Sequence, residues 1–368
     1  MESRAKLGRY LFAGLPEINH RIGPMSLSKK YPINIFASCA ASHSSPHEPN
    51  LLSLQPSGFD RRFPGGKCMN RKELIVLIVS IIVAVTVTGC FQWQSDFSPH
   101  IPSLPQTKAQ TLLEEANRLA GQADEREKLI KAIDAYKQVL QADPNNYQTL
   151  CYLSTYHLLL GDGYSTGKSE KIRNFKAALG YSERAMYTNP AFKKLIDQGI
   201  PVWQAVDSLS IQEMESMLFW TTAVFYYYKE GLGVLGQIIN YSWIKRARKV
   251  LEHMTGLDPD WNGGSIHFMW GVYYLSLPVS VGGDRELSAE YFQKAIETGP
   301  DWLLNRWGRA KYFHVKMDNP QQFKIDMEWV LAQDLHKASG PYAWNAYFIK
   351  DAWTMLDRFE EYFQPKRF

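Results

Sequence analysis

The stretch Lys245–Pro259, KRARKVLEHMTGLDP, contains the residue spacing that decides the fold. Ala247 is followed by Leu251 and Met254, at offsets of four and three, and by Pro259 five residues later. These offsets place the first three side chains on one helix face, where the small residue admits a neighbouring helix, and the proline ends the helix. The same spacing recurs at Ala132, Tyr136, Val139 and Pro144; at Ala178, Ser182, Ala185 and Pro190; and at Ser288, Phe292, Ala295 and Pro300.

This spacing is typical of the second helix of a tetratricopeptide (TPR) repeat. A partial fifth copy starts at Phe323, and first helices are visible around Leu153 and Trp270. The complete copies are 46, 69 and 41 residues apart, so the repeats are degenerate and contain insertions. The sequence therefore predicts an all-α, degenerate TPR-like helical solenoid over residues 107–368, whose concave surface is the expected binding site.

Residues 69–90 have the pattern of a bacterial lipoprotein export signal. A short positive start at 69–72 precedes fifteen uncharged residues, 74–88, and Val87-Thr88-Gly89-Cys90 resembles a lipobox. We expect 69–89 to be a signal peptide that forms a helix, and Cys90 to become the lipidated residue, bearing palmitate or a similar chain. The alternative is an uncleaved transmembrane anchor, although fifteen strongly apolar residues are short for a span of about 20.

The residues on either side of this signal lead to further expectations. Residues 1–68 are interpreted as a non-native or disordered extension, because a signal should begin near the true N-terminus, here Met69. Residues 90–106 are expected to be the lipidated cysteine and an extended tether, since Ser95–Gln106 contains three prolines. Phe91 is not the aspartate that retains lipoproteins in the inner membrane. We therefore expect a protein on the periplasmic face of the envelope, attached to the outer rather than the inner membrane.

Charge and cysteine content argue against two kinds of site, a nucleic-acid-binding surface and a reactive thiol. The net charge is +4, but the part from Cys90 onward holds 30 basic and 32 acidic residues, which does not favour nucleic-acid binding. If Cys90 is lipidated, Cys151 has no partner in the mature chain, and its apolar neighbours predict a buried, unreactive thiol.

The chain has no convincing catalytic or metal-binding motif. Residues 161–169, GDGYSTGKS, are similar to a phosphate-binding loop, but the register puts Asp162 where the first glycine belongs, and no strand precedes it. A polar loop between repeat helices is expected there instead. Histidines are scattered without metal-ligand spacing. We therefore expect no enzyme, no catalytic residue, no metal and no cofactor.

Aromatic residues are the candidates for binding. Most of them are expected to fill the core. The consecutive tyrosines 226–228, however, span about 200° of a helix and cannot all point inward, so some must face a cavity, a partner or solvent. A surface lined by tyrosine and tryptophan suits a ligand with an apolar body and a few polar groups. The candidate ligand- or partner-binding residues are Trp220, Tyr226, Tyr227, Tyr228, Trp270, Tyr273 and Tyr274.

Ordered motifs along residues 107–365 resemble the TatT family. They are HFMWGVYY at 267–274, Leu277-Pro278, Gly282-Gly283-Asp284, YFQKA at 291–295 and Ala310-Lys311-Tyr312, with YSERA at 181–185 upstream. TatT proteins are TPR-containing periplasmic lipoproteins associated with tripartite ATP-independent periplasmic (TRAP) transporters. At Leu277–Asp284 the residues also have a local interpretation, in which Pro278 stops one helix and Asp284 caps the next.

The resemblance implies an all-α fold, a lipid anchor in the membrane, a homotrimer, partnership with the transporter's periplasmic substrate-binding protein, and no enzymatic activity. The first functional hypothesis is an accessory subunit of solute uptake that also holds a small organic ligand. The alternative is a TPR scaffold lipoprotein for envelope protein assembly, with no small-molecule ligand. A deep aromatic pocket favours the first hypothesis, and an open groove suited to a peptide favours the second.

Overall fold

The computed structural model describes residues 70, 76, 93–98 and 100–363. The predicted extension 1–68, most of the predicted signal peptide and the predicted lipidation site Cys90 lie outside the described residues. Regular structure within the described part is helical, apart from one isolated bridge between Trp302 and Ser339. The all-α prediction is therefore confirmed, whereas the resemblance to TPR repeats in particular stays a prediction.

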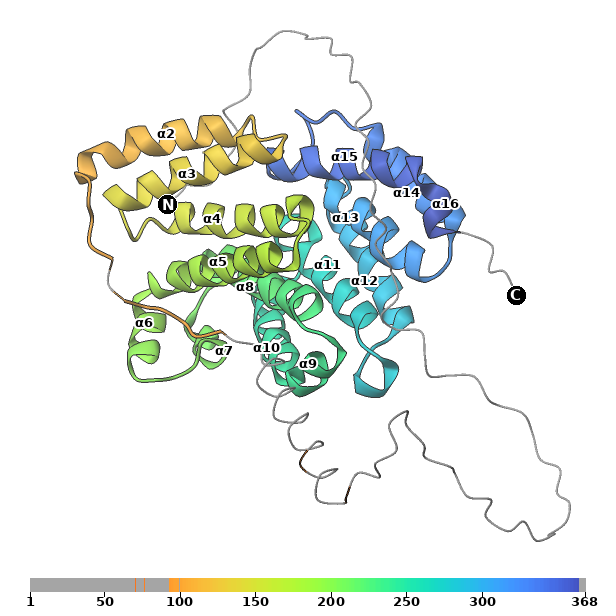
Figure 1. Cartoon of the computed structure of the whole chain (residues 1–368), viewed down its shortest axis with the longest axis horizontal. Coiled ribbons are helices and arrows are strands. Elements are labelled where there is room, and N and C mark those ends of the chain that lie inside the picture. The colour runs from red at the N-terminus through yellow and green to blue at the C-terminus, as the bar shows by residue number, and fades with distance from the viewer. Residues whose placement is uncertain (1–69, 71–75, 77–92, 99, 364–368) are drawn as a thin grey trace, which may run out of the picture. The chain divides into compact units, whose positions relative to one another are not determined.

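The helices follow each other through short connections (Figure 1). Their bounds are α2 Ala109–Ala120, α3 Arg126–Ala142, α4 Tyr147–Leu159, α5 Lys168–Tyr187, α6 Pro190–Asp197, α7 Val202–Ala205, α8 Met214–Tyr226, α9 Val234–Ile239, α10 Tyr241–Leu257, α11 Trp261–Ser276, α12 Arg285–Thr298, α13 Leu303–Gly308, α14 Pro320–Leu331, α15 Tyr342–Asp357 and α16 Phe359–Tyr362. Shorter 3-10 turns are η2 Gln106–Lys108, η4 Val206–Ser208, η5 Ile211–Glu213 and η7 Val279–Val281.

The recurring spacing marks the buried faces of α3, α5, α10, α12 and α14. In all five helices the three residues at the helix positions of the spacing are at most 1% exposed. This includes Phe323, Met327 and Val330 of the partial copy, which no proline follows. Pro144, Pro259 and Pro300 each follow within two residues of the end of a helix, as the missing N–H requires. The predicted capping by Asp284 is confirmed, because its Oδ1 accepts bonds from the N–H groups of Glu286 and Leu287.

Each of these helices packs against a preceding partner. The pairs are α2 with α3, α4 with α5, α8 with α10, α11 with α12, and α13 with α14. The longest interval between copies, from α5 to α10, is explained by α6, α7 and η5, which precede α8, and by α9, which separates the members of that pair.

The first and last helix pairs share one core. Buried residues of α3 and α4, such as Leu129 and Leu153, belong to the same cluster as Phe323 and Phe348 near the C-terminus. The indole N–H of Trp344 on α15 also donates a 2.9 Å hydrogen bond to the Thr155 hydroxyl on α4. In Figure 1, α15 accordingly lies beside the ends of the N-terminal helices. The last helices of the array therefore close against the first ones.

The predicted tether does not stand away from the helices. Trp93 and Phe97 pack against the core around α5, and the N–H groups of Ser103 and Leu104 donate to the Gln141 carbonyl at 2.8 and 2.9 Å. Phe97 stacks on Tyr187 with ring centroids 4.8 Å apart. The apolar rings of this segment favour packing on the helices over the extended character that its prolines suggest.

Among the residues that the structure describes, no helix is both long enough and apolar enough to cross a bilayer.

Candidate functional site

Three first helices of the pairs end in π-helical turns. They are η3 Leu160–Tyr164 after α4, η6 Tyr227–Gly231 after α8, and η8 Arg309–His314 after α13. A π-turn inserts one residue into the helix and is frequent at functional sites. Side chains at or beside these turns form a group that we call the π-turn cluster: Asp162, Tyr226, Lys311, Tyr312, Tyr347 and Asp351.

Tyr226 brings two of the turns together. Its hydroxyl donates a 3.2 Å hydrogen bond to Oδ2 of Asp162 and also interacts with the Tyr312 hydroxyl. Its ring stacks on Phe175 of α5 with centroids 5.2 Å apart. Lys229, on the turn that follows Tyr226, places its ammonium 5.6 Å from the centre of the Tyr312 ring. The end of α8 thus contacts both Asp162 and the turn after α13.

Lys311 lies at the other side of the cluster. Its ammonium donates to Asp351 Oδ2 at 2.9 Å and to the Tyr347 hydroxyl at 3.2 Å, and it sits 4.7 Å from the centre of the Trp307 ring. The indole N–H of Trp307 holds the same Asp351 oxygen at 2.8 Å. The side chains of Lys311 and Asp351 remain 24% and 19% exposed, so the pair is accessible to a ligand.

Protonation states in the cluster follow from burial and charge. Burial opposes the charge on Lys311, but the carboxylates of Asp351 and Asp162 outweigh it, so the pKa of Lys311 is raised. Burial raises the pKa of Tyr226, Tyr312 and Tyr347, and the nearby carboxylates raise it further. At neutral pH the cluster therefore offers one ammonium, carboxylate oxygens and neutral phenol groups.

The seven aromatic residues that the sequence offered as binding candidates do not lie together in the structure. Tyr226 alone belongs to the π-turn cluster, and Tyr228 donates to the Gln237 carbonyl at 2.6 Å instead. Tyr227 is buried, at 4% exposure, so the three tyrosines do point in different directions.

The remaining candidates lie in the core or close to it. Trp220 is 1% exposed and donates to the buried carboxylate of Glu183 at 2.9 Å. Trp270 and Tyr273 are buried, and the half-buried Tyr274 stacks on Trp270 with centroids 5.5 Å apart. The structure does not bring these four aromatic residues into the cluster.

Sequence reasoning missed most of the cluster. Asp162 stands in the glycine-rich segment that we expected to be a polar loop, but the structure continues the helix there as a π-turn, with Gly161 buried. Lys311 and Tyr312 stand out in the sequence only as part of the motif Ala310-Lys311-Tyr312 of the family resemblance. Tyr347 and Asp351 carry no signal, because only the closure of the array brings α15 to this place.

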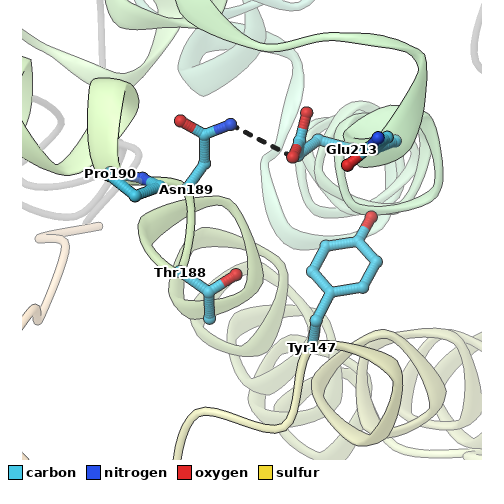
Figure 2. A pocket seen from close by; sticks show the side chains of 6 residues that line it. Tyr147, Thr188, Asn189, Pro190 and Glu213 are labelled. Carbon is cyan, nitrogen blue, oxygen red and sulfur yellow. Dashed lines mark hydrogen bonds between the residues drawn. The ribbon is translucent and has the colours of Figure 1, made fainter.

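A recess away from the π-turn cluster lies between the start of α4, the connection from α5 to α6, and η5 (Figure 2). Its volume is about 380 Å³, and it is lined by Tyr147, Thr188, Asn189, Pro190, Gln212 and Glu213. Asn189 caps α6 through its oxygen and donates to Glu213 Oε1 at 3.1 Å, while Glu213 Oε2 accepts from the N–H of Ser210. These polar groups are occupied in helix capping, so we assign the recess a structural role.

A cluster of metal ligands or a reactive thiol would be an alternative site in the described part of the chain. No group of three or more histidine, cysteine, aspartate or glutamate side chains is placed to hold a metal ion there. Cys151 is fully buried, and burial raises its pKa, which makes the thiolate unfavourable. The arrangement can bind by charge, hydrogen bonds and ring faces.

Comparison with known families supplies the remaining information. The sequence model described as TRAP transporter T-component matches residues 175–363, which is just over half of the 368-residue chain. The chain belongs to the TRAP transporter T-component family. The matched region includes all cluster residues except Asp162. A comparison with curated proteins finds no match.

Membership makes the protein a periplasmic component associated with TRAP transport, as the sequence resemblance predicted.

Proposed function

We propose that this T-component is a lipid-anchored accessory protein of solute uptake that holds a small organic ligand at the π-turn cluster and docks the periplasmic substrate-binding protein. It acts by binding and has no catalytic activity. Family membership supports the role in transport. The ligand site is proposed mainly because Lys311 places a charged group among the helices while 24% of its side chain stays exposed.

The chemistry of the cluster defines the ligand class. Bonds to Asp351 and Tyr347 use two of the three N–H groups of Lys311, and one remains for an acceptor on the ligand. The rings of Tyr226 and Tyr312 provide apolar contact next to hydroxyl groups. A small molecule with an apolar body and a carboxylate or similar acceptor fits this combination.

Ligand binding is tested with the purified mature protein and a panel of small carboxylic acids, measured by thermal shift and calorimetry. We expect at least one acid to bind, and the change Lys311→Met to weaken it by about tenfold or more, as for loss of one charge-assisted hydrogen bond. Lys350→Met, on the exposed side of α15, is the matched control and should bind like the wild type. Equal binding by both variants would contradict the site.

Docking is tested separately by pull-down, with the purified mature protein as bait and the periplasmic substrate-binding protein of a TRAP transporter as the expected prey. Recovery of that protein supports the proposal, and light scattering of the purified protein tests the homotrimer that the family resemblance implies. Recovery of envelope-assembly factors alone would reject the transport role in favour of a scaffold without a small ligand.

A further inference from the structure

An exposed apolar surface surrounds the short helix α9. Large aliphatic side chains are mostly buried in the described structure, yet here several are 41–79% exposed. The Tyr241 hydroxyl at the start of α10, directly after α9, donates to the Val281 carbonyl of η7 at 2.8 Å. Figure 1 shows α9 and the loop after α11 at the same lower edge. The aliphatic members of this surface, called the α9 patch, are Val234, Leu235, Ile238, Ile239, Val279 and Val281.

The sequence around α9 is that of an interfacial segment. Residues 231–244 contain no charged side chain, and they are flanked by Lys229-Glu230 on one side and Lys245-Arg246 on the other. Fourteen residues are too few for a span of about 20, but a short apolar segment with flanking cations suits the plane of a membrane interface. The ammonium of Lys245 lies 5.4 Å from the centre of the Tyr241 ring. Tyrosine and lysine beside aliphatic residues are typical of that boundary.

The N-terminal segment limits how far the helices can stand from a lipid at Cys90. Trp93 is docked by the 3.0 Å hydrogen bond of its indole N–H to Glu183. Only Phe91 and Gln92 separate it from Cys90. Three residues of extended chain reach about 10 Å, so an anchored chain holds the surface around Trp93 close to the headgroups.

Helix α5 connects this anchor point to the α9 patch. Trp93 lies over Gly180, and Ile172 lies within van der Waals reach of Gly231, at the turn that leads into α9. Gly180 and Ile172 are eight residues apart, which is about 12 Å along a helix. The docked segment and the patch are therefore near neighbours on the molecule.

We propose that the α9 patch rests in the membrane interface, with its aliphatic side chains among the lipids and Lys245 at anionic headgroups. The proposal rests on the lipid anchor of the proposed function, since the anchor brings this surface to the bilayer. A second copy of the chain is the competing occupant, and the test separates the two.

The test uses the mature lipoprotein with one new cysteine carrying an environment-sensitive fluorophore. Leu235→Cys places the label on α9, and Ile325→Cys, an aliphatic residue of α14 that is 45% exposed, is the matched control. In vesicles of phosphatidylethanolamine and phosphatidylglycerol we expect a blue-shifted emission at position 235, quenched by spin-labelled lipid, and neither effect at position 325. Equal signals at both positions would overturn the proposal.

Two further experiments distinguish membrane contact by α9 from the effect of the lipid anchor and from self-association. The unlipidated Cys90→Ser variant should float with the same vesicles, and adding Leu235→Asp and Ile238→Asp should weaken flotation by about tenfold or more. Absence of palmitate labelling would reject the anchor, while flotation of Cys90→Ser would still report on α9. A blue shift at position 235 that rises with protein concentration without vesicles would identify a protein interface and overturn the membrane assignment.

Discussion

Glu183 is a carboxyl group held between two indoles in the core. It is 1% exposed and accepts bonds from Trp93 and Trp220 at 3.0 and 2.9 Å. Burial raises its pKa from 4.5 to about 7, although the indole bonds act in the opposite direction. The folded state therefore holds a proton that the unfolded chain releases at lower pH.

We predict that Glu183 makes the protein less stable as pH rises from its unfolded pKa of 4.5 toward its folded pKa of about 7. Glu183→Gln keeps an oxygen for the indoles and removes the charge. The stability of this variant relative to the wild type should increase by about 2 kcal/mol between about pH 5 and about pH 8. Urea denaturation at both pH values measures it, with the exposed Glu252→Gln as control. An unchanged difference would show that Glu183 titrates normally.

Asp326 is also a buried carboxyl group, but unlike Glu183 it is paired with arginine side chains. It is fully buried, and the Arg309 guanidinium binds both its oxygens at 2.7 and 2.8 Å. Burial would raise its pKa, but Arg309 and His314 outweigh it, so the pKa is lowered. Its contribution to stability is thus present at neutral pH and is lost as pH falls toward the folded pKa.

We predict that Asp326→Asn lowers the free energy of unfolding by about 3 kcal/mol at neutral pH, because it leaves Arg309 partly buried without its counter-charge. Chemical denaturation measures the loss. Asp301→Asn, at an exposed turn, should change stability by less than about 0.5 kcal/mol. A loss that persists undiminished under acidic conditions would contradict the ionic origin.

At the scale of elements, close helix approach depends on particular glycines. Helix α11 begins with left-handed residues, and Gly264 has φ 79°. A side chain there would place its Cβ 2.7 Å from the carbonyl oxygen of Ala295 on α12. The Asn305 amide bonds the same Ala295 oxygen at 2.7 Å, so the backbone has little room to move.

We predict that Gly264→Ala destabilises the protein by about 3 kcal/mol, since left-handed strain adds to a backbone clash. Gly256→Ala on α10 is the control, because a Cβ there meets nothing within 4 Å. It should stabilise the protein by about 0.5–1 kcal/mol through helix propensity. Thermal and urea denaturation measure both variants. Equal effects would show that α11 and α12 can separate at little cost.

The same elements show what a sequence can and cannot reveal here. The spacing at Ala247, Leu251 and Met254 predicts a buried helix face because a helix repeats every 3.6 residues, a local property. The packing of Trp93 on Glu183 depends on contacts between distant segments, and nothing local encodes it. The π-turn cluster could not be predicted for the same reason. Asp162 and Lys311 are 149 residues apart, and they come close only because the turns that hold them pack together in the folded chain.

At the scale of the whole molecule, closure should make the two ends of the array stabilise each other. Trp344 packs on both large core clusters and donates to Thr155 across the closure. An open solenoid would transmit a change only to the neighbouring repeat. In a closed array, loosening α15 also loosens α4.

We predict that Trp344→Ala lowers the free energy of unfolding by about 3 kcal/mol and speeds amide exchange in α4 as well as in α15. Hydrogen-exchange mass spectrometry localises the effect. Trp353→Ala, on the same helix but 62% exposed, should change neither by much. Faster exchange confined to α14–α16 would indicate that the closure contributes little.

The closure also decides when the protein can fold. Thr155 and Trp344 lie 189 residues apart, so the side chains that α4 packs against are synthesised late. Until then the N-terminal helices keep apolar faces uncovered, and pairing across so long a loop is slow. The C-terminal helices must therefore be present before the N-terminal helices can complete their packing.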